Sequence, residues 1–182
     1  MTRPEFLAWE EQQELRHEFD GVAVRAMTGG TAARALIQAN LIIALGVGLR
    51  GKPCRVIGSE LKVETASGYR YPDAMVICSP IAAGSKAATE PAVLFEIVSP
   101  SSSSIDFVTK NAEYRLLPSV QRYVVLQQNT IAAAVFSRRG EDWLSELVAG
   151  ADAVLRMPEL DLALPLAAIY RDIDLQPDPG QG

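Results

Sequence analysis

Three ionisable side chains, Asp73, Glu96 and Lys110, lie where they could act together chemically. Glu96 interrupts the apolar run AVLFEIVS at 92–99, and a carboxylate inside a buried strand needs a cation or strong donors, because isolated burial is costly or raises its pKa. Asp73 follows Tyr-Pro in the strand-like segment 69–79, and Lys110 lies on the next expected helix. Two carboxylates sharing a hard divalent cation, with a lysine beside it, are the minimal equipment for metal-dependent phosphodiester hydrolysis.

Each of these residues also has a plainer interpretation. Asp73 could accept turn hydrogen bonds, and Glu96 could lie on a half-exposed strand face. Lys110 could form a solvated ion pair with Asp106, four positions earlier on the same helix. However, the neighbours of Glu96 do not alternate with polar residues, so we expect both faces of its strand to be covered. The combination of two acids and a lysine favours the metal site.

The overall composition is that of an ordinary globular protein, with 182 residues of which 48% are hydrophobic and 21% charged. We therefore expect a single domain over residues 1–182. The net charge of −5 is uneven, because residues 140–182 carry nine acidic and two basic residues while the rest is nearly neutral. Bulk charge thus neither supports nor excludes contact with a polyanion.

Several classes of protein are disfavoured. The chain opens without a basic-then-apolar signal, and its longest apolar stretch, residues 41–49, is far shorter than a membrane span. Cys54 and Cys78 do not make a disulfide framework, and their spacing is wrong for a metal knuckle, so we expect a reducing, cytoplasmic location. A single histidine, His17, excludes multi-histidine zinc sites.

The apolar periodicity and the turn residues predict the elements that must position these groups. We expect helices at 4–17, 28–51, 105–118 and 164–173, and strands at 54–65, 69–79, 92–99 and 143–149. The Asp-Gly turn predicts an edge strand or a hairpin at 18–27, and we also expect a hairpin of 120–128 with 131–139 and a frayed tail at 176–182. Helices and strands alternate in quick succession without a linker. This order predicts an α+β (mixed α/β) fold with one central sheet.

The chain resembles a known family at several of these segments, which include FLAWEEQQELRHEFDG, YPDAMVIC and PAVLFEIVSPSSSSIDFVTKNAEYRLLP. It is similar to the PD-(D/E)XK nuclease superfamily and, more closely, to the restriction endonuclease domain family known as Uma-two. The resemblance implies a restriction-endonuclease-like core, a central mixed β-sheet flanked by helices, with Asp73 and Glu96 as ligands of Mg²⁺ or Mn²⁺. The superfamily's usual lysine position is Val98 here, and the family implies that Lys110 takes over that role.

The resemblance implies further site residues and an assembly. Glu18, in the HEFDG element, would complete the catalytic set, and Tyr114 would lie near the substrate. Arg34 stands where relatives have a histidine after TGGTAA, so it would contact phosphate or mark a weakened activity. The family also favours a homodimer.

These observations lead to one expected function and one alternative. The first is a Mg²⁺-dependent endodeoxyribonuclease that acts on DNA away from any membrane. The alternative is a non-catalytic homodimer with the nuclease fold that serves as a nucleic-acid or protein binding module, which the acidic C-terminal segment and Arg34 favour.

Overall fold

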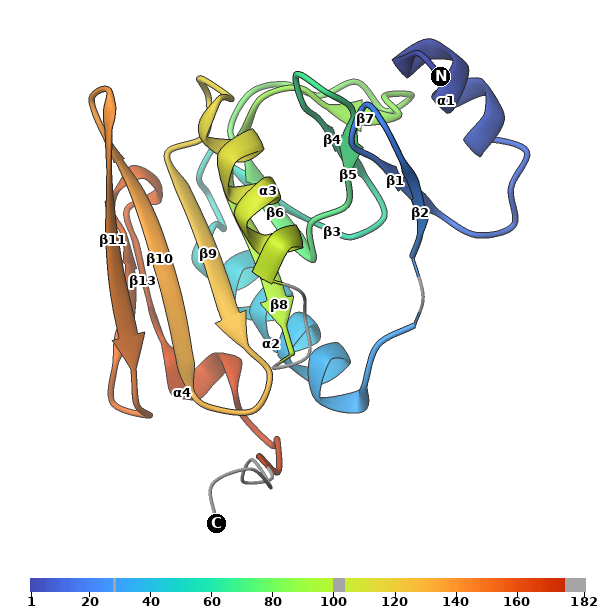
Figure 1. The fold of residues 1–182 in the computed structure, drawn as a ribbon. Coiled ribbons are helices and arrows are strands. Elements are labelled where there is room, and N and C mark those ends of the chain that lie inside the picture. Colours follow the sequence, from blue (N-terminus) through green and yellow to red (C-terminus); the bar gives the residue numbers. More distant parts are fainter. Residues whose placement is uncertain (28, 100–103, 176–182) are drawn as a thin grey trace.

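The computed structural model describes residues 1–27, 29–99 and 104–175, and Figure 1 shows their arrangement. The predicted frayed tail at 176–182 lies outside the described residues.

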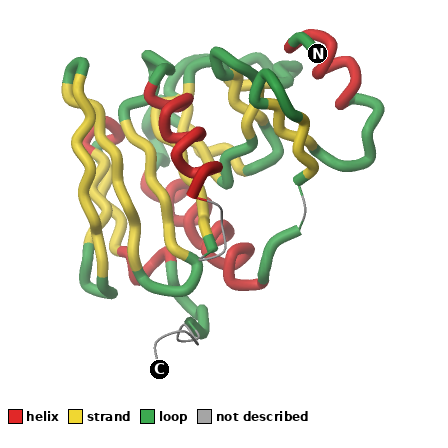
Figure 2. Tube along the Cα trace, in the orientation of Figure 1, coloured by secondary structure: helices red, strands yellow, loops and turns green. Residues whose placement is uncertain are grey.

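A six-stranded mixed sheet in the order β11-β10-β9-β8-β6-β3 forms the centre of the fold. Its strands are β3 (Arg55–Gly58), β6 (Ala74–Ile77), β8 (Pro91–Val98), β9 (Arg122–Gln127), β10 (Ala132–Arg139) and β11 (Asp142–Ala149). Only the pairing of β8 with β9 is parallel within this sheet, and helix α3 (Ser104–Arg115) makes that connection over one face. Helix α2 (Ala32–Gly48) lies on the opposite side (Figures 1 and 2), so the predicted mixed sheet flanked by helices is confirmed.

Helix α2 is the main helix that the apolar spacing predicts. Thr31 caps its N-terminus by accepting a hydrogen bond from a backbone N–H in the first turn. Ile37, Leu41 and Leu45 recur every four residues and are fully buried against the sheet. No helix in the described part of the chain, α2 included, is long and apolar enough to span a bilayer.

Both faces of β8 are covered, as the absence of polar alternation predicted. Phe95 and Ile97 pack into the core on the α2 side, whereas Leu94 packs into the core that includes Tyr114 of α3. Successive side chains of a strand point to opposite faces, so Glu96 shares the side of Leu94 and is buried under α3.

Beside the predicted central sheet lies a second, five-stranded sheet in the order β2-β1-β5-β4-β7, which was not predicted. Its strands are β1 (His17–Phe19), β2 (Val24–Ala26), β4 (Lys62–Glu64), β5 (Tyr69–Arg70) and β7 (Ala87–Ala88). The predicted strand 54–65 is in fact two strands, because the chain turns at Ser59 and Glu60 between β3 and β4. The hairpin predicted within 18–27 is confirmed as β1 and β2, with Gly21 at φ +89° in its turn.

Helix α1 (Arg3–Glu10) is shorter than the helix predicted at 4–17. Thr2 and Glu5 form a capping box, and Phe6 is fully buried. The helix ends at Glu10, whose Oε1 accepts a hydrogen bond of 3.0 Å from the backbone N–H of His17. The intervening residues therefore form a loop that leads into β1, and Leu15 is exposed.

The C-terminal part confirms the predicted hairpin of β9 and β10 and the strand after it. It also contains a two-stranded sheet that the sequence did not predict. The elements are β12 (Val154–Met157), the 3-10 helix η1 (Pro158–Leu160), β13 (Leu162–Pro165) and α4 (Leu166–Ile169). Their apolar residues complete the core on the α2 side of the large sheet.

Cys54 and Cys78, from which no disulfide framework was expected, are joined by a single disulfide. Arg55 pairs with Ile77 in the antiparallel register of β3 and β6, which places the two cysteines opposite each other at the next position. The cross-link joins the two strands at the end away from Asp73.

Candidate active site

The register of two neighbouring strands brings the predicted acids together. Ala74 of β6 pairs with Phe95 of β8, so Asp73, just before β6, lies beside the position of Glu96. The backbone N–H of Ile97 donates a hydrogen bond of 2.7 Å to Asp73 Oδ2. The two acids therefore meet at the same point of the large sheet.

Arg34, in the first turn of α2, holds the Asp73 carboxylate. Its Nε and Nη2 lie 3.0 Å and 2.8 Å from Asp73 Oδ1, and Nη2 lies 3.0 Å from Oδ2. One turn further along α2, Gln38 Nε2 donates to the backbone oxygen of Asp73 at 2.7 Å. Asp73 is 4% exposed, so it is buried beneath these α2 side chains.

Glu96 is buried and contacts two side chains of α3. Lys110 Nζ lies 3.3 Å from Glu96 Oε1, and the Tyr114 hydroxyl donates to the same oxygen at 3.1 Å. Residues four apart share one helix face, which explains why Lys110 and Tyr114 reach the same carboxylate. Burial raises the pKa of Glu96 from 4.5 to about 7, with Asp73 and Glu18 adding to the rise and Lys110 opposing it.

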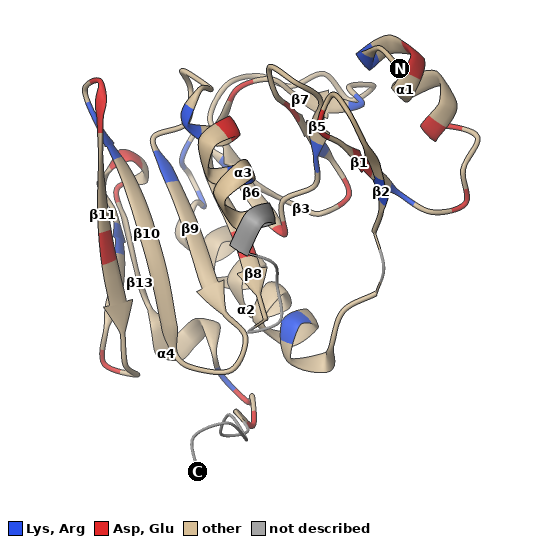
Figure 3. Cartoon of the chain, viewed as in Figure 1, with Lys and Arg blue, Asp and Glu red and all other residues tan. Residues whose placement is uncertain are grey.

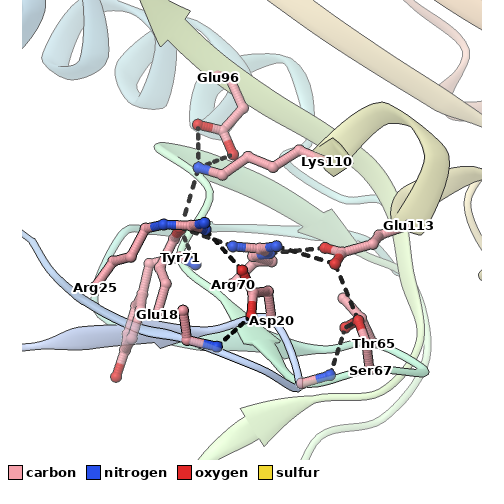
Figure 4. Close-up of polar contacts among 12 residues, drawn as sticks. Glu18, Asp20, Arg25, Thr65, Ser67, Arg70, Tyr71, Glu96, Lys110 and Glu113 are labelled. Atoms are coloured by element: carbon pink, nitrogen blue, oxygen red, sulfur yellow. Dashed lines mark hydrogen bonds and ion pairs between the residues drawn. The ribbon is translucent and has the colours of Figure 1, made fainter. Parts of the chain in front are cut away.

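Lys110 also reaches the small sheet, where its Nζ lies 3.1 Å from Oε1 of Glu18 on β1. Figure 4 shows this lysine between the carboxylates of Glu96 and Glu18. Glu18 Oε1 also accepts from the backbone N–H of Tyr71 at 3.0 Å. The structure thus joins three predicted site residues from β1, β8 and α3, while the catalytic roles of these residues stay predictions.

Arg70 and Glu113 belong to the same network, and the sequence interpretation missed both. The Arg70 side chain is fully buried, with Nε and Nη2 donating to Glu113 at 2.7 Å and 2.9 Å. Burial lowers the pKa of Arg70, but the hydrogen bonds and charge of Glu113, together with the charge of Glu18, raise it more, so the pKa lies above its ordinary value. Glu113 is three residues after Lys110, a helical spacing that could have revealed it, whereas Arg70 on a two-residue strand gives no such signal.

A cavity of about 760 Å³ opens beside this network. The charged residues in its lining are Glu14, Arg16, Glu18, Arg25, Arg34, Asp73 and Lys110. Glu96 is not among the lining residues and lies deeper, at 5% exposure. Basic and acidic residues are interspersed over the described chain (Figure 3), and the cavity lining brings Asp73 and Glu18 together with Arg34 and Lys110.

Asp73 and Glu96 supply the oxygen donors that Mg²⁺ takes from proteins, one or two carboxylates completed by waters. Their donor chemistry therefore fits the metal that the resemblance implies. The described residues hold no ready-made cluster of three or more His, Cys, Asp or Glu side chains that could bind a metal ion. In the structure, Arg34 and Lys110 are the cations that face the two acids.

Comparisons with known proteins agree with this fold. An uncharacterized protein of Synechocystis sp., slr1290, is 28% identical over 95% of this chain and 93% of its own length. A second from the same organism, sll1609, is 27% identical over 84% of this chain and 90% of its own length. The crystal structure of a "putative nuclease belonging to DUF820" from Anabaena variabilis matches the fold with a TM-score of 0.75 at 20% identity, covering 93% of this chain and 97% of that one.

The sequence also matches a family model, Uma2, described as "Putative restriction endonuclease", over residues 3–167. The match includes β1, α2, β6, β8 and α3, which carry or adjoin the predicted site residues. Because the family model covers nearly the whole chain, the protein belongs to the Uma2 family of restriction-endonuclease-like proteins.

Proposed function

We propose that this protein is a Mg²⁺-dependent endonuclease, with Mn²⁺ as an alternative metal, that hydrolyses DNA phosphodiester bonds in the cavity beside Asp73. The observation that carries the proposal is the meeting of Asp73 and Glu96 on paired strands, with Lys110 bridging Glu96 and Glu18. Membership of the Uma2 family supports a nucleic-acid substrate.

Each residue has a defined part in the proposed reaction. Asp73 and Glu96 would hold the metal, which supplies charge neutralisation at the phosphoryl oxygens. Lys110 would orient the attacking water and stabilise the negative charge that develops on the phosphate. Glu18 holds the Lys110 ammonium at 3.1 Å, so it would position this lysine. In this reaction water would attack phosphorus and give up one proton, the bond from phosphorus to the leaving oxygen would break, and the leaving oxygen would take up one proton, so that the protons balance. Tyr114 would support the site by holding Glu96, since its hydroxyl donates to that carboxylate.

Cleavage of plasmid DNA with Mg²⁺ or Mn²⁺ tests the proposal. We expect Asp73→Asn and Glu96→Gln to lower the cleavage rate on the order of 100-fold or more, because each removes a charged ligand. Glu146→Gln removes a carboxylate from the exposed edge strand β11 and should cleave at the wild-type rate. Equal rates in all four proteins would show that the nuclease activity does not come from this site.

The non-catalytic alternative has one observation in its favour, the hydrogen bonds that already join Arg34 to Asp73. If the wild type retards DNA in a gel shift but cleaves it with neither metal, the protein is a binding module with a nuclease fold.

We further propose that the protein acts as a homodimer and that α2 forms the contact. Leu36, Ile43 and Val47 of α2 point away from the core and are 45%, 58% and 56% exposed. Large apolar side chains that gather on an exposed face are typical of a contact surface, so these residues of α2 support a partner surface. In a two-fold dimer the same three apolar residues of a second copy would meet them.

A further inference from the structure

Arg34 donates hydrogen bonds to the same carboxylate oxygens of Asp73 that would bind a metal ion. Asp73 Oδ1 accepts two hydrogen bonds from Arg34, and Oδ2 accepts one from Arg34 and one from the backbone of Ile97. A carboxylate offers about four lone-pair positions, so these four hydrogen bonds fill the Asp73 carboxylate. A metal ion can bind Asp73 in this site only if a donor leaves, and Arg34 supplies three of the four hydrogen bonds.

The charges of the site are nearly balanced by the protein itself. The carboxylates of Glu18, Asp73 and Glu96 face the cations of Arg34 and Lys110, with Arg70 shared between Glu18 and Glu113. A divalent cation added to this set leaves an excess of positive charge. A phosphodiester anion in the cavity would relieve that excess.

Arg34 is the cation best placed to move. Its side chain is 36% exposed and lines the cavity, whereas the side chains of Lys110 and Arg70 are 10% and 0% exposed. The neighbouring Gly30 leaves room for this side chain, because a Cβ there would stand 2.9 Å from Arg34 Cδ. The guanidinium can therefore turn into the cavity without opening the core.

We propose, on the basis of the proposed nuclease function, that Arg34 is a displaceable counterion that couples metal binding to phosphodiester binding. Without metal its guanidinium neutralises Asp73. When a divalent cation binds Asp73, the guanidinium turns to the phosphodiester in the cavity, whose anionic oxygens suit its planar fork of donors. Binding of the metal frees the guanidinium for the phosphodiester, and binding of the phosphodiester draws the guanidinium away from Asp73. Each of the two ligands therefore strengthens the binding of the other by the same factor.

Calorimetric titration of the full chain with Mn²⁺ tests this coupling, without and with saturating dimethyl phosphate as a minimal phosphodiester. We expect Arg34→Ala to tighten the Mn²⁺ Kd roughly tenfold, since the competing cation is gone. Dimethyl phosphate should tighten the wild-type Kd about fivefold and leave that of Arg34→Ala unchanged. Arg34→Lys keeps the positive charge but loses the planar pair of donors. Its Kd for Mn²⁺ should lie between that of the wild type and that of Arg34→Ala.

Arg25→Ala is the matched control, because Arg25 lines the same cavity but pairs with Asp20 at 2.8 Å. Equal changes of the Mn²⁺ Kd in Arg25→Ala and Arg34→Ala, or a weaker Kd in Arg34→Ala with native circular dichroism, would overturn the proposal. Loss of the dimethyl phosphate effect in Arg34→Ala alone would support it. Absence of Mn²⁺ binding in both wild type and Arg34→Ala would overturn it together with the metal site. Coupled binding without DNA cleavage would overturn only the nuclease function.

Discussion

Replacing Lys110 by methionine removes an ammonium that lies 3.1 Å from Glu18 and 3.3 Å from Glu96, and keeps most of its apolar stem. Removing one partner of a buried ion pair costs about 3–5 kcal/mol, because the other charge stays buried. Both acids keep a further partner, since Tyr114 donates to Glu96 and Arg70 contacts Glu18. We therefore expect Lys110→Met to lower the free energy of unfolding by about 3 kcal/mol at pH 9, at the lower end of that range.

The loss should depend on pH through Glu96. Burial raises the pKa of Glu96 from 4.5 to about 7 while Lys110 opposes the rise, so removing Lys110 raises the pKa further. A carboxyl with a raised pKa in the folded state contributes stability that is present below its unfolded pKa and is lost as the pH rises through the folded pKa. In the wild type the loss of stability that Glu96 causes is complete near pH 7, its pKa in the folded state. In the variant the folded pKa is higher, so the loss of stability continues to higher pH. The destabilisation should therefore grow between pH 6 and pH 9, by about 1.4 kcal/mol for each unit by which the pKa of Glu96 rises further.

Urea unfolding of the metal-free protein at pH 6, 7.5 and 9, followed by tryptophan fluorescence, measures this difference. Lys86→Met is the control, because Lys86 pairs with Glu11 on the surface and its side chain is 61% exposed. We expect this control to lose less than about 1 kcal/mol, without a trend between pH 6 and 9. A destabilisation of Lys110→Met that is equal at pH 6 and pH 9 would refute the coupling between Lys110 and Glu96.

Two further predictions concern the support of the site and the assembly. A Cβ at Gly68 would stand 1.9 Å from the backbone oxygen of Phe19, so Gly68→Ala should push β5 from β1 and cost about 2–3 kcal/mol in urea unfolding. Gly84→Ala has no atom within 4 Å to meet and should change stability by at most about 0.5 kcal/mol, and similar losses in the two variants would contradict the steric argument. In sedimentation velocity, Ile43→Glu should convert the proposed dimer to a monomer, while Leu116→Glu, at an exposed position after the end of α3, should not. A dimer that survives Ile43→Glu would exclude α2 as its contact.

The large sheet and its helices were predictable because their signals are local and periodic. The apolar run around Glu96 predicted a strand covered on both faces, and that strand is β8. Apolar residues at helical spacing predicted α2, and a helix between two strands predicted α3, although the ends of both helices differ by a few residues. The small sheet was not predicted as a separate layer, because strands of two to three residues are too short to show alternation.

The sequence by itself determined which groups could do chemistry here: an acid in a buried strand, an acid at the start of its neighbour, and a lysine one helix later. Only the tertiary structure decided their partners, because those partners are far apart in the chain. Arg34 lies 39 positions from Asp73, and Arg70 lies 52 positions from Glu18, so no periodic pattern links them. An arginine's charge is visible in any sequence, but the carboxylate that it neutralises depends on how the sheets and helices pack. That packing placed Arg34 on Asp73, and it thereby set the condition under which a metal could bind.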